Sequence, residues 1–269
     1  MPSGFVHHKK SALHFTTIGT GPRNLLLFHG FGQDNNIYYS LAENLSSHFT
    51  IYVFDLYFHG KSDWGYGELA LEKDHWKETI LKFLEENGIQ DFSVAGFSLG
   101  GKFALATVEA MPDRVHEIFL LAPDGIKTSF WYSMATYPLL LRKLFKSMIH
   151  HPEHFLSISK VLHKMGLVDK SLIKFAVYQM NSEEKRNRVY YSWVVFRHLR
   201  FDLSKLARII NHHKIFVTIV VGQYDRVIKA TAMQRFVKKL DRCRFETPEA
   251  GHSGLISVSV KYFHKNAQR

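Results

Sequence analysis

The sequence predicts an α/β protein in which helices flank a mostly parallel central sheet and a helical cap is inserted into the chain. In the first half and again near the C-terminus, short apolar runs alternate with longer segments of helical period, a rhythm typical of parallel sheets. Between them, residues 127–205 contain no convincing strand. A structureless loop of that length is improbable in a compact domain, so we expect this stretch to be helical.

Six apolar runs of strand length predict the sheet. They lack the strict alternation of a half-exposed strand and therefore suit strands that are buried on both faces. The runs are residues 24–29, 50–55, 92–97, 117–122, 214–222 and 243–247. An additional hairpin is expected within residues 5–18, at the edge of the sheet.

The segments between these runs predict the helices that cover the sheet. The segment 71–87 ends at Asn87-Gly88, a favourable helix C-cap. The expected helices are residues 37–45, 71–87, 98–111, 230–240 and a last one after His252. The core should therefore comprise residues 1–126 and 206–269, and the cap residues 127–205.

Composition restricts the class of protein. Of 269 residues, 46% are hydrophobic and 22% charged, which excludes a disordered or fibrous chain. Cys243 is the single cysteine, so no internal disulfide forms, as suits a reducing compartment. The longest run without a charged residue, 128–141, has 14 residues, whereas a membrane span needs about 20. Because residues 1–10 also lack the apolar run of a signal peptide, we expect a cytoplasmic protein without a transmembrane segment.

The positive charge is concentrated in the predicted cap. The net charge is +11, and residues 127–205 hold 14 Lys and Arg against five Asp and Glu. Such a segment suits an anionic or lipid-like partner, including peripheral contact with a membrane. The alternative is that the lysines form a solvated face. No nucleic-acid-binding motif accompanies the charge, so nucleic acid is not an expected partner.

The segment 96–101 (GFSLGG) is the first candidate for chemistry. It follows a predicted buried strand and opens a predicted helix, so Ser98 lies at a sharp turn that projects its hydroxyl away from the sheet. Glycines are needed there because side chains would collide with neighbouring backbone. The alternative is a glycine-rich helix start with a capping serine.

A second segment, 29–32 (HGFG), ends the first predicted buried strand. We call it the oxyanion loop, because an oxyanion formed at Ser98 needs two converging N–H donors. Leu99, the residue after the serine, supplies one donor, and Phe31 in this loop is the candidate for the other. The alternative is a tight loop that needs glycine only for its backbone angles.

Asp225 and His252 each follow a predicted strand and complete the candidate set. A serine hydroxyl is a poor nucleophile until an imidazole takes its proton, and the imidazole needs a carboxylate to fix its tautomer. Ligands of open α/β sheets bind at the carboxyl ends of strands, where all these residues are expected. Asp124, which follows another predicted strand, is the competing acid; we favour Asp225.

Taken together, these motifs resemble the α/β-hydrolase fold family over almost the whole chain. The order Ser98, Asp225, His252 matches the family's order of nucleophile, acid and base. Residues 55–62 (DLYFHGKS) resemble its D-x-x-G-x-G-x-S turn, which is structural in the family, but Phe58 stands where glycine is usual. The resemblance also implies that residues 127–205 are the cap.

The resemblance implies a serine hydrolase that cleaves a carboxylic ester or thioester of a small acyl substrate through an acyl-enzyme. The same residues also suit an acyltransferase, a C–C hydrolase, a lyase or a non-catalytic receptor. No cofactor or metal is expected, since the adjacent histidine pairs diverge. The aromatic cap residues Phe130, Trp131 and Tyr137 are candidates for substrate binding, although packing of the cap onto the core is the alternative.

Overall fold

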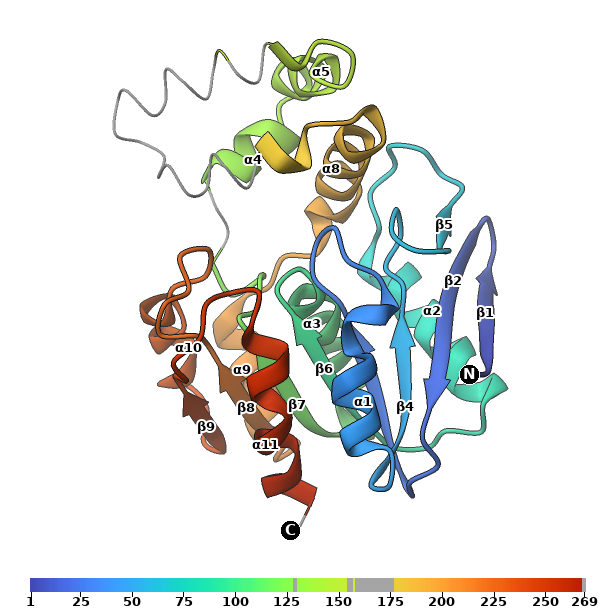
Figure 1. Ribbon diagram of the computed structural model, residues 1–269, viewed down its shortest axis with the longest axis vertical. Helices are drawn as coiled ribbons and strands as arrows, with labels where there is room; N and C mark the ends of the chain where they lie inside the picture. The colour runs from blue at the N-terminus through green and yellow to red at the C-terminus, as the bar shows by residue number, and fades with distance from the viewer. Residues whose placement is uncertain (128–129, 154–156, 158–176, 268–269) are drawn as a thin grey trace. The chain divides into compact units, whose positions relative to one another are not determined.

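A computed structural model describes residues 1–127, 130–153, 157 and 177–267. Its centre is a nine-stranded sheet in the order β1-β2-β4-β3-β6-β7-β8-β9, with the short β5 paired to β2 (Figure 1). The strands are β1 (Ser3–His8), β2 (Ser11–Ile18), β3 (Arg23–Phe28), β4 (Phe49–Phe54), β5 (Asp63–Trp64), β6 (Phe92–Phe97), β7 (Val115–Leu121), β8 (Phe216–Val220) and β9 (Cys243–Glu246).

The pairing confirms the predicted mostly parallel sheet. Strand β3 is parallel to β4 and β6, and β6, β7, β8 and β9 follow as parallel neighbours. The predicted N-terminal hairpin is present as antiparallel β1 and β2, and β2 joins the sheet antiparallel to β4. The carboxyl ends of β3, β6, β7, β8 and β9 consequently lie along one edge of the sheet.

Helices cover both faces of the sheet. In Figure 1, α1 (Tyr39–Leu45) and α11 (Leu255–Ala267) lie in front of it, and α2 (Lys73–Glu86), α3 (Gly100–Ala110) and α9 (Leu203–His212) lie behind. The core strands are mostly apolar because both faces are covered; all six residues of β6 are buried. The helix predicted over 230–240 is instead a 3-10 turn, η4 (Ala230–Ala232), followed by the single turn α10 (Gln234–Val237).

The chain divides into two compact units. The first comprises residues 1–66, 71–127 and 199–269, and the second residues 67–70 and 128–198. The described helices of the second unit are α4 (Phe130–Thr136), α5 (Leu139–Ser147), α8 (Glu183–Val195) and η3 (Phe196–His198). The predicted boundary after residue 205 falls inside α9, which begins at the N-cap Asp202. Within the described ranges, no helix is long and apolar enough to cross a bilayer.

Close backbone approach at the start of α3 explains the glycines around Ser98. A Cβ on Gly100 would meet the carbonyl oxygen of Phe28 and lie 2.5 Å from its carbonyl carbon. Both contacts are with backbone of the central strand β3, which no side-chain rotation relieves. Helix α3 therefore packs at this distance from β3 only because residue 100 has no side chain.

We expect Gly100→Ala to lower the free energy of unfolding by about 3 kcal/mol, because overpacking against fixed backbone displaces α3 from β3. Urea unfolding followed by circular dichroism measures the change. Gly254→Ala is the matched control, since a Cβ there meets nothing within 4 Å, and we expect a change within about 0.5 kcal/mol. Equal stability of both variants would contradict this packing account.

Candidate active site

Ser98 occupies a strained turn between β6 and α3. Its φ of +50° lies in the left-handed region, which costs a residue with a side chain about 1–2 kcal/mol. Three hydrogen bonds hold the turn: the Ser98 N–H donates to the carbonyl of Leu121 over 2.9 Å, and the Ser98 carbonyl accepts from Asp124 N–H (2.8 Å) and Gly101 N–H (2.9 Å). The predicted serine thus lies at the sharp strand-to-helix turn that the sequence indicates.

The structure brings Ser98, His252 and Asp225 into one hydrogen-bonded chain. Nε2 of His252 lies 3.1 Å from Oγ of Ser98, and Nδ1 of the same ring lies 2.6 Å from Oδ2 of Asp225. The imidazole also packs against the ring of Phe97, with centroids 4.9 Å apart. A carboxylate accepts from Nδ1–H, so Nε2 is left to accept the proton of the serine hydroxyl.

The carboxylate oxygen of Asp225 that does not face His252 accepts hydrogen bonds from the protein backbone. Its Oδ1 accepts hydrogen bonds from the N–H groups of Val227 and Ile228, both at 2.8 Å. The Asp225 side chain is fully buried, whereas that of His252 is 20% exposed. The loop after β8 therefore presents one carboxylate oxygen in a fixed direction to the imidazole, which retains access to solvent.

Asp124, the competing acid, has a different partner. Its Oδ2 lies 3.2 Å from Nζ of Lys102, an ion pair in which the lysine side chain is 6% exposed. Its other oxygen accepts from the N–H of Gly125 over 2.7 Å. The carboxylate of Asp124 thus compensates the buried ammonium of Lys102, whereas the carboxylate of Asp225 faces the imidazole.

The oxyanion loop follows β3 as predicted and contains a residue with positive φ, Gly32, at +74°. A Cβ on Gly30 would lie 2.9 Å from the ring of Phe97, so this residue must also be small. Within the described part of the chain, the N–H groups of Phe31 and Leu99 donate to no protein acceptor. Both predicted donors are accordingly available to a ligand.

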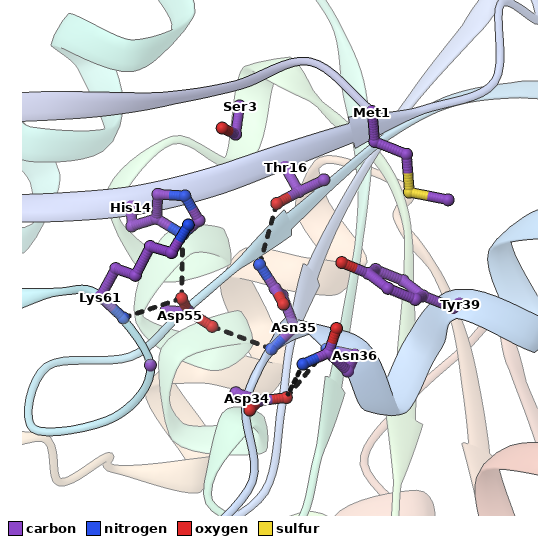
Figure 2. A pocket seen from close by; sticks show the side chains of 11 residues that line it. Met1, Ser3, His14, Thr16, Asp34, Asn35, Asn36, Tyr39, Asp55 and Lys61 are labelled. Carbon is purple, nitrogen blue, oxygen red and sulfur yellow. Dashed lines mark hydrogen bonds and ion pairs between the residues drawn. The ribbon is translucent and has the colours of Figure 1, made fainter.

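A second histidine–carboxylate pair lies in a polar cavity of about 440 Å³. Figure 2 shows Nδ1 of His14 pointing at Asp55, 2.9 Å from its Oδ2, while the other carboxylate oxygen accepts from Asn35 N–H and Lys61 N–H donates to Oδ2. The neighbouring hydroxyl, on Ser62, donates to the carbonyl of Asp55 over 2.6 Å. The proton of the Ser62 hydroxyl is thus already donated to a backbone carbonyl. The His14–Asp55 pair therefore anchors the 55–62 turn and does not activate this hydroxyl as a nucleophile.

The turn forms despite the departure from the family pattern. Phe58 adopts φ +67° at the position where glycine is usual, so it carries strain of about 1–2 kcal/mol. Gly60 (φ +51°) approaches the Asp55 carboxylate closely, and Lys61 N–H donates to that carboxylate over 3.0 Å. These contacts keep the turn in place.

The predicted cap contacts remain predictions. The side chains of Phe130 and Trp131, at the start of α4, lie outside the described residues. The hydroxyl of Tyr137 donates to the carbonyl of Arg197 over 2.6 Å, a contact within the second unit. This bond favours a packing role for Tyr137.

The environment of Cys243 does not favour a catalytic thiol. Burial raises the pKa of its thiol to about 11, so the group stays protonated and a poor nucleophile at neutral pH. His59 also contacts the oxyanion loop, since its Nε2 accepts the Gly32 N–H over 3.0 Å. The spacing of the DLYFHGKS turn does not predict this contact, because it does not show where the ring points. Among the described residues, no group of three His, Cys, Asp or Glu is placed to hold a metal ion.

Comparisons with known proteins agree with this architecture. Residues 23–147 match the family model described as the alpha/beta hydrolase fold. Among solved structures, a membrane phospholipase A described as a bacterial virulence factor has a TM-score of 0.69 at 18% identity, over 100% of this chain and 87% of that one. The naproxen esterase of Bacillus subtilis has a TM-score of 0.66 at 17% identity, over 100% and 90%. The chain has the alpha/beta hydrolase fold.

Two of the sequence relatives carry the same name. A pimeloyl-[acyl-carrier protein] methyl ester esterase of Nitrosomonas europaea is 29% identical over 274 residues, which cover 94% of this chain and 97% of the relative. A protein of the same name from Nitrosospira multiformis is 30% identical over 122 residues, 45% of this chain and 46% of the relative. The first of these likenesses extends over both the predicted core and the predicted cap.

Proposed function

We propose that this protein is a serine hydrolase that cleaves a carboxylic ester through an acyl-enzyme intermediate. The observation that carries the proposal is the chain of hydrogen bonds from Ser98 Oγ through His252 to Asp225, at 3.1 and 2.6 Å. The general activity, hydrolysis of a carboxylic ester, is supported by the esterase relative that matches 94% of the chain.

The mechanism follows from the roles of these groups. Oγ of Ser98 attacks the acyl carbon while Nε2 of His252 accepts its proton, and Asp225 stabilises the resulting imidazolium. The N–H groups of Phe31 and Leu99 bind the oxyanion of the tetrahedral intermediate. His252 then protonates the leaving alcohol. Water, deprotonated by the same imidazole, attacks the acyl-enzyme and releases the acid.

For the substrate, we propose an ester of an acyl group that is borne by an anionic carrier. The excess of Lys and Arg within residues 127–205 provides the complementary charge. The curated relatives are named for a methyl ester on an acyl-carrier protein, which makes such an ester the first natural substrate to test. Phospholipids and acyl-CoA share the combination of acyl chain and anionic group.

A labelling experiment tests the proposed chemistry. Wild-type protein is incubated with a fluorophosphonate, and the modified peptide is mapped by mass spectrometry, beside p-nitrophenyl esters of increasing chain length. We expect one adduct, on Ser98, and saturable ester turnover that labelling abolishes. Absence of both label and turnover would instead favour a non-catalytic receptor of the same fold. Turnover that appears only with an acceptor alcohol or thiol would indicate an acyltransferase.

Charge reversal in α5 tests the proposed substrate class. Lys143 is exposed on this helix and Arg142 is half-buried. We expect the double variant Arg142→Glu/Lys143→Glu to lower kcat/KM for an acyl-carrier-bound ester by at least about tenfold, since each cation near an anionic surface contributes about 1 kcal/mol. Turnover of p-nitrophenyl acetate should be unchanged.

The matched control reverses two exposed cations of the core, Lys77 and Lys238, which leaves the change in net charge equal. We expect the control to retain activity on both substrates. If the α5 variant loses activity equally on the charged and the neutral ester, the proposed role of the cap charge is wrong.

A further inference from the structure

The peptide unit that carries the Phe31 N–H is fixed by its own carbonyl oxygen. That oxygen belongs to Gly30, and it accepts a hydrogen bond from Nδ1 of His29 over 2.7 Å. Because a trans peptide unit is planar, its C=O and N–H point in opposite directions. The His29 contact therefore determines the direction in which the Phe31 N–H points.

The next peptide unit is fixed by a residue from another part of the chain. The Gly32 N–H donates to Nε2 of His59 over 3.0 Å. The His59 ring also meets the ring of Phe31 edge-on, with centroids 5.4 Å apart and an interplanar angle of 88°. His59 thus holds both the backbone after Phe31 and the Phe31 side chain.

The two histidines hold the oxyanion loop and the 55–62 turn reciprocally. Nε2 of His29, in the loop, accepts the N–H of Leu56 in the turn over 3.0 Å, while Nε2 of His59, in the turn, accepts a loop N–H. The Nδ1 atom of His59 lies 3.0 Å from the carbonyl of Tyr57. In both rings, therefore, Nε2 faces a donor and Nδ1 faces a carbonyl, a pattern that assigns the neutral tautomer with its proton on Nδ1.

We propose that His59 is a positioning residue for ester hydrolysis: through Gly32 and the Phe31 ring it holds the Phe31 N–H in the direction required to bind the oxyanion. The inference rests on the proposed function, in which that N–H is one of two oxyanion donors. Both imidazoles are buried, with exposed fractions of 0% for His29 and 2% for His59. Removal of the His59 ring therefore leaves the Gly32 N–H without this acceptor, and its peptide unit is free to reorient.

Two substitutions separate the contacts of His59. His59→Phe keeps a ring for Phe31 but has no acceptor, and His59→Gln keeps an acceptor near the place of Nε2 but has no ring. We expect His59→Phe to lower kcat for a p-nitrophenyl ester by about a hundredfold and to keep KM within about threefold of wild type. The reason is that a Phe31 N–H pointing in the wrong direction no longer stabilises the transition state, whereas substrate binding does not require it. His59→Gln should recover kcat to within about fivefold of wild type. If His59→Phe does not fold, His59→Leu takes its place.

The matched control is His75→Leu, which removes another imidazole, one whose ring packs against His8, Trp64 and Tyr66. Burial lowers the pKa of His75 to about 4, so this ring is also neutral at neutral pH, and its Nε2 lies 3.0 Å from the hydroxyl of Ser11. We expect the control to change the melting temperature and leave kcat unchanged. The melting temperature of every variant is measured by circular dichroism beside the kinetics.

The outcomes distinguish this inference from the proposed function. If wild-type Ser98 takes no fluorophosphonate label, the proposed function itself fails. If Ser98 is labelled and His59→Phe keeps kcat within threefold of wild type, the positioning role is overturned. It is also overturned if His59→Phe and His59→Gln lose kcat equally while both melt at lower temperature, since that result describes a structural residue only.

Discussion

Ser98→Ala is expected to lower kcat for ester hydrolysis by about 10⁴-fold or more, because the variant has no hydroxyl to form the acyl-enzyme. KM should change little, since binding of the acyl chain does not require the hydroxyl. The measurement is kcat and KM for a p-nitrophenyl ester, together with the loss of fluorophosphonate labelling. Residual turnover above the uncatalysed rate comes from the oxyanion donors alone.

The control for this variant is Ser40→Ala, an exposed serine of α1, which should leave both kinetics and labelling unchanged. The far-ultraviolet circular dichroism of Ser98→Ala should match that of wild type, because alanine occupies the same φ as serine with the same strain. Retention of more than a tenth of wild-type kcat by Ser98→Ala would exclude Ser98 as the nucleophile.

The second large effect distinguishes the two candidate acids. Asp225→Asn is expected to lower kcat by about 10⁴-fold, because an amide can donate to Nδ1 of His252 and so stabilise the tautomer that cannot accept the serine proton. Asp124→Asn should keep kcat within about tenfold. Its cost falls on stability, since it weakens the charge compensation of the buried Lys102 ammonium.

For both variants, kcat is measured and stability is determined by urea unfolding. Asp225→Asn should unfold near the wild-type midpoint, because the asparagine oxygen still accepts from Val227 and Ile228, whereas Asp124→Asn should unfold at lower urea. The reverse pattern, in which Asp124→Asn abolishes turnover and Asp225→Asn does not, would assign the acid to Asp124.

Much of the sheet and the candidate triad follows from the sequence, because each rests on a local signal. An apolar run marks β6, whose predicted and observed bounds are both 92–97, and the glycines after it mark the turn at Ser98. Element ends are less well predicted. The run 214–222 forms a strand only over Phe216–Val220. At its N-terminal end, Lys214 adopts φ +55° and cannot continue a ladder.

Contacts between distant loops are the part that the sequence does not reveal. Two residues that follow strands are expected at the same sheet edge, which is how Asp225 and His252 were predicted. No such rule places His59 against Gly32, because both lie in irregular backbone where a change of one dihedral angle moves a ring by several ångströms. The ion pair between Asp124 and Lys102 also cannot be predicted from their spacing in the sequence. It forms only once α3, which carries Lys102, has packed against the sheet.

The pairing of β7 with β8 joins strands that are far apart in the chain, since the whole cap segment lies between Leu121 and Phe216. The entropy lost in closing such a loop grows only with the logarithm of its length, by about 0.6 kcal/mol for each doubling. Relatives of this protein can therefore lengthen or shorten the insertion with little effect on the stability of the sheet. That segment is accordingly free to change while the strand ends that carry Ser98, Asp225 and His252 stay in place.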